Sequence, residues 1–148
     1  MSGQVIGIIG LAICVLACGC GSAIGLCYTG QAGAGVLAED PKKFSKVLVL
    51  VVLPATQGIY GFVLGILGQS YLAGIETVAQ GWALFGAVMP TAIVGLIAAI
   101  YQGKCSVASI YAVTKNEGLS GKLILFPAMI ETYAILALVS SILLLAVV

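Results

Sequence analysis

Charge is what this sequence lacks most. The 148 residues include six Lys or Arg and five Asp or Glu, so that only 7% are charged while 61% are hydrophobic. The mean hydropathy is +1.22. Soluble domains usually carry about 25% charged residues. The composition therefore excludes an ordinary soluble domain and indicates a membrane protein.

The sequence contains no histidine and no arginine, and its six cationic residues are all lysines. Without histidine, the five cysteines have no partner for a mixed zinc site, and their spacing suggests no disulfide set. We expect them to pack between helices as small, weakly polar residues. A metal or redox role for Cys18 and Cys20 is the alternative, and it requires a polar, accessible pocket.

The chain also has no Gly-Lys-Ser/Thr phosphate-binding loop, although it contains 20 glycines. The glycines are therefore interpreted as packing residues. We expect a protein that is not itself an enzyme and hydrolyses no nucleotide, and nothing in the sequence suggests a nucleic-acid partner.

Four long runs are almost free of charged residues. They are residues 1–38, 47–75, 77–103 and, interrupted only by Glu131, 123–148. Each is long enough to cross a hydrocarbon core, which takes about 20 apolar residues in a helix. Barrel strands would be about ten residues long and would alternate with polar positions. The sequence therefore predicts an all-α membrane protein with transmembrane helices at about 3–38, 44–74, 77–113 and 118–148.

The first run could be mistaken for a secretory signal, and "VLACGC" loosely resembles a lipoprotein cleavage site. A signal peptide begins with a basic segment, however, and no lysine precedes Lys42. We expect the first helix to be retained.

Lysines mark the links between the first and second helices and between the third and fourth. These are Lys42, Lys43, Lys46, Lys115 and Lys122. The opposite link has only Glu76. By the positive-inside rule, both basic links are cytoplasmic and both termini lie outside the cell membrane, which we expect to be bacterial. Lys104 falls inside the third helix, and we expect its ammonium to reach toward the cytoplasmic surface.

One offset of 73 residues relates the two halves of the chain. It joins Pro54 with Pro127, Tyr60 with Tyr133, Tyr28 with Tyr101, and Gly30 with Gly103. The sequence therefore predicts two duplicated hairpins, residues 1–74 and 75–148, in one compact membrane domain. Both run in the same direction, which weakens an alternating-access transporter interpretation, although parallel repeats also occur in transporters.

The first helix of each hairpin carries small residues at every fourth position. They are Ala17, Gly21, Gly25, Thr29 and Gly33 in one, and Ala83, Ala87, Thr91, Gly95, Ala99 and Gly103 in the other. Such stripes let helix backbones approach closely in lipid. They could pack within one chain. The bulkier second and fourth helices favour a homo-oligomeric ring with the small helices on its inner wall.

Glu131 lies in "FPAMIETYAIL", a segment that is otherwise uncharged. A buried carboxylate in lipid must be protonated, paired or bound to a cation. A protonated glutamate that joins two helices is one interpretation, but an ionisable group at this depth is usually functional. The sister position of Glu131, 73 residues earlier in the first hairpin, is Gly58. The carboxylate therefore occurs once per four helices.

Oxygen-bearing side chains are predicted near the depth of Glu131. In "LPATQGIY", Leu53, Thr56, Gln57 and Tyr60 share one helical face, and Gln102 lies at similar depth on the third helix. Hydroxyl, amide and carboxylate oxygens suit a small hard cation. A single negative charge favours Na⁺ over Ca²⁺ or Mg²⁺, whereas a proton carrier would need only the carboxyl group. Pro54 and Pro127 can loosen the helices locally and turn carbonyls toward the site.

The segments "LPATQGIYGF", "PAMIETYAIL" and "YQGK", together with the duplicated hairpin, closely resemble the proteolipid K (or c) subunit of bacterial V-type, sodium-translocating rotary ATPases. The resemblance covers essentially the whole chain. It implies a lipid-embedded ring of identical subunits, in contact with a stator subunit that carries an arginine and with central-stalk subunits at the cytoplasmic loops. It also implies the sodium ligands Leu53 (backbone carbonyl), Thr56, Gln57, Gln102 and Glu131, with the Tyr60 hydroxyl steadying Glu131.

Two alternatives remain open at this point. One is a proton-carrying ring of the same class, in which H⁺ takes the place of Na⁺ at Glu131. The other is a tetraspan cation transporter that works alone, without ATPase partners.

Overall fold

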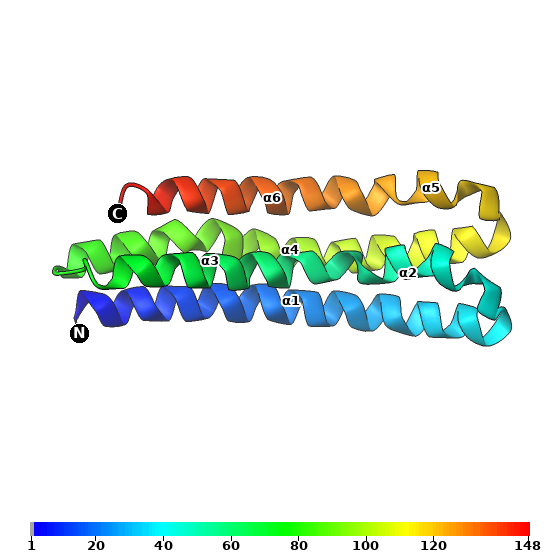
Figure 1. Ribbon diagram of the computed structural model, residues 1–148, viewed down its shortest axis with the longest axis horizontal. Coiled ribbons are helices and arrows are strands. Elements are labelled where there is room, and N and C mark those ends of the chain that lie inside the picture. Colours follow the sequence, from blue (N-terminus) through cyan, green and yellow to red (C-terminus); the bar gives the residue numbers. More distant parts are fainter. Residues whose placement is uncertain (1) are drawn as a thin grey trace.

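The computed structural model describes residues 2–148, and the side chains of all of these except Glu117. The chain forms four antiparallel rods (Figure 1). In order, they consist of α1 (Gly3–Glu39), α2 and α3 (Phe44–Val52 and Thr56–Leu72), α4 (Val78–Lys115), and α5 and α6 (Ser120–Leu123 and Leu125–Leu145). All four rods are long and apolar enough to cross a membrane. The predicted all-α fold with four transmembrane helices is confirmed.

Both termini lie at one end of the bundle, and the two links that carry lysines lie at the other (Figure 1). We call the latter the lysine-bearing end. Three short 3₁₀ helices complete the chain: η1 (Pro41–Lys43), η2 (Leu53–Ala55) and η3 (Glu117–Leu119). The predicted helix boundaries are correct to within a few residues.

The second and fourth helices are not continuous, although continuous helices were predicted. The second rod changes to a 3₁₀ turn at Leu53–Ala55, and the fourth is interrupted at Ile124, three residues before Pro127. Proline has no N–H for the carbonyl four residues earlier, and its ring clashes with that carbonyl. Pro127 thus leaves the Leu123 carbonyl without its helical donor, and the Ser109 hydroxyl of α4 donates to it at 3.1 Å.

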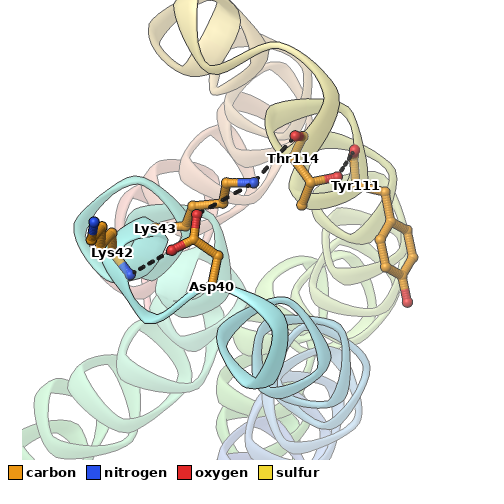
Figure 2. Close-up of polar contacts among 5 residues, drawn as sticks. All are labelled: Asp40, Lys42, Lys43, Tyr111 and Thr114. Atoms are coloured by element: carbon orange, nitrogen blue, oxygen red, sulfur yellow. Dashed lines mark hydrogen bonds and ion pairs between the residues drawn. The ribbon is translucent and has the colours of Figure 1, made fainter.

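The lysine-bearing end is held together across the two hairpins (Figure 2). Asp40 accepts a hydrogen bond from the backbone N–H of Lys42 at 3.1 Å. The Lys43 ammonium lies 3.8 Å from the Asp40 carboxylate and donates to the Thr114 carbonyl, near the end of α4, at 3.3 Å. The last turn of a helix leaves carbonyls unpaired, so Lys43 satisfies one of them while joining the first link to α4.

The central contact of the bundle is between α1 and α4, with α3 packed on α1 and α6 packed on α4. Small residues make the central contact close. A Cβ atom added to Gly103 would lie 2.6 Å from the Cα of Gly25, and one added to Gly21 would lie 2.8 Å from the Cα of Leu96. The predicted close approach of the small-residue stripes is therefore confirmed, and it takes place within one chain.

Some glycines are not used in this contact. Gly19, Gly30, Gly35 and Gly86 have no atom of another segment within 4 Å of an added Cβ. Within the single chain, these positions leave open surface on α1 and α4.

Candidate functional site

Glu131 projects from α6 into the junction of α3, α4 and α6, where its side chain is half-buried. Oε2 accepts hydrogen bonds from Thr56 Oγ1 at 2.8 Å, Gln57 Nε2 at 2.7 Å and Gln102 Nε2 at 2.8 Å. Oε1 accepts one from the Tyr60 hydroxyl at 2.5 Å. Four donors thus converge on one carboxylate. Hydrogen bonds to an ionised acceptor are stronger than those between neutral groups, so these four contacts hold the side chain of Glu131 in a fixed position.

The 3₁₀ turn η2 sets the geometry of the α3 side of the site. Thr56 follows the turn directly, and its hydroxyl lies 3.1 Å from the Leu53 carbonyl as well as next to Glu131. On the α6 side, Gln102 Nε2 also donates to the carbonyl of Pro127 at 3.1 Å. The backbone oxygens of Leu53 and Pro127 therefore each accept a hydrogen bond from a side chain of the site.

The two glutamines form the floor of the site and are completely buried. Gln57 Nε2 donates to Gln102 Oε1 at 2.7 Å as well as to Glu131. Gln57 Oε1 has no hydrogen-bond donor among the described residues. A buried acceptor without a donor costs free energy. If this amide turned, Oε1 would point into the site and could coordinate a cation, and Nε2 would take the position that Oε1 has now. The oxygen-rich set therefore fits a small cation.

The site brings together all six residues that the sequence nominates: Leu53, Thr56, Gln57, Tyr60, Gln102 and Glu131. Their roles as ion ligands stay predictions. The Pro127 carbonyl was not foreseen as a partner of Gln102. The sequence does hold an indication of this contact. The 73-residue offset makes Pro127 the sister of Pro54, and Pro54 directly follows Leu53, whose carbonyl is one of the predicted ligands.

The sister site in the first hairpin is closed to an ion. The backbone N–H of Gly58, the sister of Glu131, donates to the Ser22 hydroxyl at 2.8 Å. A Cβ at Gly58 would lie 3.1 Å from the same oxygen. Thr29, the sister of Gln102, donates to the Val51 carbonyl at 2.7 Å. The space that a carboxylate occupies in the second hairpin is thus filled by short hydroxyl side chains in the first.

The cysteines form no site. Cys18 is buried and its thiol donates to the Thr91 carbonyl at 3.3 Å, whereas Cys20 lies on the exposed side of α1. The two thiols therefore cannot share one pocket. Over the part of the chain that the structure describes, no group of three or more His, Cys, Asp or Glu could hold a metal ion. Glu131 with its neutral oxygen neighbours is the remaining candidate.

Four membrane-spanning rods that hold a single carboxylate among neutral hydrogen-bond donors define a class of protein, the small membrane proteolipid. The family model for the C subunit of ATP synthase matches residues 5–68 and 85–144, one stretch in each hairpin. The chain belongs to this family, whose members form oligomeric rings. The predicted family and ring are thus confirmed.

Two relatives are similar over nearly the whole chain. The V-type sodium ATPase subunit K of Enterococcus hirae is 42% identical over 142 residues, which are 96% of this chain and 91% of that protein. The A-type ATP synthase subunit K of Methanocaldococcus jannaschii is 42% identical over 141 residues, which are 95% of this chain and 62% of that protein.

Proposed function

We propose that this chain is a rotor-ring subunit of a V-type ATPase and carries Na⁺ across the membrane at Glu131. The observation that carries the proposal is the set of donors around the Glu131 carboxylate, together with the buried Gln57 oxygen that has no donor among the described residues. The name of the Enterococcus hirae relative supports Na⁺ as the ion.

In the loaded state, the ion takes five oxygen ligands. They are the Leu53 carbonyl, Thr56 Oγ1, the amide oxygens of Gln57 and Gln102, and the Glu131 carboxylate. Both amides turn their oxygens inward, and the Tyr60 hydroxyl keeps Oε1 in place. One carboxylate balances one monovalent cation, so the loaded site is neutral. Divalent ions usually recruit more carboxylates.

Neutrality lets the loaded site pass through lipid, where an isolated charge is very costly. The ion enters from a stator subunit, travels with the ring, and leaves at a second stator path, where a stator arginine displaces it. Both termini face outside, and the lysine-bearing end contacts the central stalk in the cytoplasm. Partner subunits hydrolyse ATP and supply the torque.

The number of carboxylates in the ring sets the number of ions carried per turn. Moving one charge against 100 mV takes about 2.3 kcal/mol. A ring with one carboxylate per four helices carries fewer ions per turn than a ring of equal circumference with one per hairpin. The arrangement therefore suits pumping against a steep gradient.

A proton is a poorer fit than Na⁺. All four side-chain partners donate to Glu131. A protonated carboxyl donates at one oxygen, and a hydroxyl or a turned amide could accept that hydrogen bond, so the direction of these bonds does not separate the two ions. The argument for Na⁺ is the number of oxygen-bearing side chains, because a proton carrier needs only the carboxyl group.

Carbodiimide labelling of the intact ring tests the ion. At fixed pH, Na⁺ should slow the modification of Glu131, because a bound cation covers the carboxylate. Labelling that Na⁺ leaves unchanged and that slows only with rising pH would establish a proton ring instead. Reconstitution without partner subunits should give no ²²Na⁺ flux; a flux in that preparation would support the stand-alone transporter.

A further inference from the structure

The 3₁₀ turn η2 lies directly on α1, a helix that supplies none of the six site residues. The residues of α1 that face the turn are Ser22, Gly25 and Thr29, at positions i, i+3 and i+7 of one helical face. All of them are buried. A Cβ added to Gly25 would lie 2.7 Å from the Cβ of Pro54, in the middle of the turn. A hydroxyl side chain stands on each side of this close contact, and each one bonds the backbone of the second rod.

Thr29 holds the chain just before the turn. Its hydroxyl donates to the Val51 carbonyl at 2.7 Å, whereas the carbonyls of Gly25 and Leu26, in its own helix, lie farther away at 3.3 and 3.2 Å. In a 3₁₀ turn an N–H bonds the carbonyl three residues earlier instead of four. The N–H of Ala55 is therefore drawn away from the Val51 carbonyl, which it would serve in an α-helix. Thr29 supplies the donor that the turn removes.

Ser22 holds the chain just after the turn. Its hydroxyl oxygen accepts a hydrogen bond from the backbone N–H of Gly58, the third residue of α3, at 2.8 Å. The first turn of a helix leaves N–H groups without an α-helical partner, and Ser22 provides one. Gly58 lies between Gln57 and Tyr60 in the chain, and both of these side chains bond Glu131. The contact with Ser22 thus fixes the backbone from which they project.

The segment between these two bonds, from Val51 to Gly58, carries three of the five proposed ion ligands, namely the Leu53 carbonyl, the Thr56 hydroxyl and the Gln57 amide. The other two project from α4 and α6. The position of the segment on α1 therefore sets how far its oxygens lie from those of the second hairpin. Na⁺ and K⁺ carry the same charge and differ in size. A site separates them by the spacing of its oxygens and by how firmly that spacing is kept.

We infer that Ser22 and Thr29 are positioning residues that set the preference of the site for Na⁺ over K⁺, although neither contacts the ion. They hold the turn at a fixed distance from Glu131, so the ring of oxygens does not widen around a larger cation. Thr29 is the sister of Gln102, so the same position of the repeat supplies a ligand in one hairpin and a support in the other. The inference rests on the proposed function, in which Glu131 carries Na⁺.

The test measures, on the intact ring, the Na⁺ and K⁺ concentrations that each halve the rate of carbodiimide labelling at Glu131. Thr29→Val keeps the shape of the side chain and removes its hydroxyl. The preference for Na⁺ over K⁺ should fall several-fold, because the released turn can adapt to the larger ion. Thr29→Ser keeps the hydroxyl and should keep the preference of the wild-type ring.

Thr91→Val is the matched control for a general loss of packing. Thr91 is 1% exposed and Thr29 is 0% exposed, and the Thr91 hydroxyl also donates to a carbonyl of a facing helix, that of Ala137, at 3.2 Å. Thr91 lies 11 positions before Gln102 on α4, which is roughly 16 Å along the helix. Thr91→Val should therefore destabilise the chain about as much as Thr29→Val and leave the preference for Na⁺ unchanged.

Ser22→Ala tests the second bond independently and should also lower the preference, even if Thr29→Val prevents assembly. In both variants the backbone N–H groups of residues 51–58 should exchange with deuterium faster than in Thr91→Val, whether or not an ion is bound. Labelling that Na⁺ does not slow in the wild-type ring would overturn the proposed function and this inference with it. Protection by Na⁺ with an unchanged preference in Thr29→Val and Ser22→Ala would overturn the inference alone.

Discussion

The Tyr60 hydroxyl donates to Glu131 Oε1 at 2.5 Å, although the two residues are 71 positions apart and belong to different hairpins. The contact spans the narrow meeting of α3 and α6, two helices that otherwise touch little. Tyr60 and Glu131 are both half-buried, whereas Gln57 and Gln102 behind them are completely buried. The phenol therefore forms the outer side of the site, between the carboxylate and the surrounding lipid.

Tyr60→Phe removes this hydroxyl and keeps the ring. We expect Na⁺ affinity to fall roughly tenfold, since a hydrogen bond to a charged group contributes about 1.5–3 kcal/mol and the contact is half-exposed. The measurement is the Na⁺ concentration that halves the rate of Glu131 labelling. Tyr133→Phe is the matched control, because Tyr133 is the sister residue and is 68% exposed. Equal protection constants for the two variants would contradict the role of Tyr60.

Thr56→Ala removes a hydroxyl that lies 2.8 Å from Glu131 Oε2 and 3.1 Å from the Leu53 carbonyl. We expect a several-fold loss of ²²Na⁺ occupancy with a normal yield of assembled ring, because the side chain is only half-buried and its loss leaves a small cavity. Thr132→Ala is the control, since its exposed hydroxyl bonds only the Met129 carbonyl. Unchanged occupancy in Thr56→Ala would show that the Thr56 hydroxyl is not a ligand of the ion.

Glu131→Gln removes the one carboxylate of the site and keeps its shape. ATP-driven ²²Na⁺ transport by the whole enzyme should fall below detection, because a neutral amide cannot balance the ion. Carbodiimide labelling should be lost as well. Glu76→Gln, in the exposed link between α3 and α4, should transport normally. Transport that survives in Glu131→Gln would show that the ion binds elsewhere.

The sequence was sufficient to predict the residues of the site, because the relevant information is local. Spacing alone puts Thr56, Gln57 and Tyr60 on one face of a helix, and the offset of 73 residues aligns that face with Glu131. What it could not give are contacts that depend on how the rods pack. The bond from Ser109 to the Leu123 carbonyl and the bond from Lys43 to the Thr114 carbonyl join backbone atoms that have no signature in a side-chain pattern.

The interruption of the second rod shows the same limit. Pro54 predicts a loosened helix, but the choice of a 3₁₀ turn at Leu53–Ala55 depends on the packing around it. Pro54 lies against Gly25, where a Cβ would come within 2.7 Å of the proline ring. Pro90 of α4, by contrast, interrupts no helix. The sequence marks both positions as prolines and does not distinguish them.

Gly103→Ala tests the close packing of α1 on α4. The new methyl group would lie 2.6 Å from the Cα of Gly25, which is backbone and cannot move aside as a side chain would. We expect a loss of about 1–3 kcal/mol in the free energy of unfolding, the usual cost of overpacking. Gly86→Ala makes the same change on the same helix where no atom lies within 4 Å, and it should be neutral. The readout is the temperature at which the helices of the chain unfold.

The duplication also predicts how one copy meets the next. A groove of 280 Å³ between α4 and α6 is lined by residues that include Val94, Ala98 and Tyr133. Their sisters in the first hairpin, Gly21, Gly25 and Tyr60, face the second hairpin of the same chain. The groove is therefore equivalent to a surface of the first hairpin that the second hairpin covers, but within one chain nothing covers the groove itself. Contacts of this head-to-tail kind, repeated with rotation, close into a ring.

A disulfide between copies tests this register. Gly21 packs against Leu96 within the chain, and shifting each by 73 positions pairs Val94 of one copy with Ala23 of the next. Ala23 is exposed and Val94 half-exposed within one chain, as an interface would require. In a Cys20→Ser, Cys27→Ser background, Ala23→Cys with Val94→Cys should give a ladder of cross-linked oligomers on oxidation.

Either cysteine alone should give no ladder, because cross-linking needs Cα atoms about 4.4–6.8 Å apart. If the oxidised double variant stayed monomeric, neighbouring copies would not pack in the register that the repeat predicts.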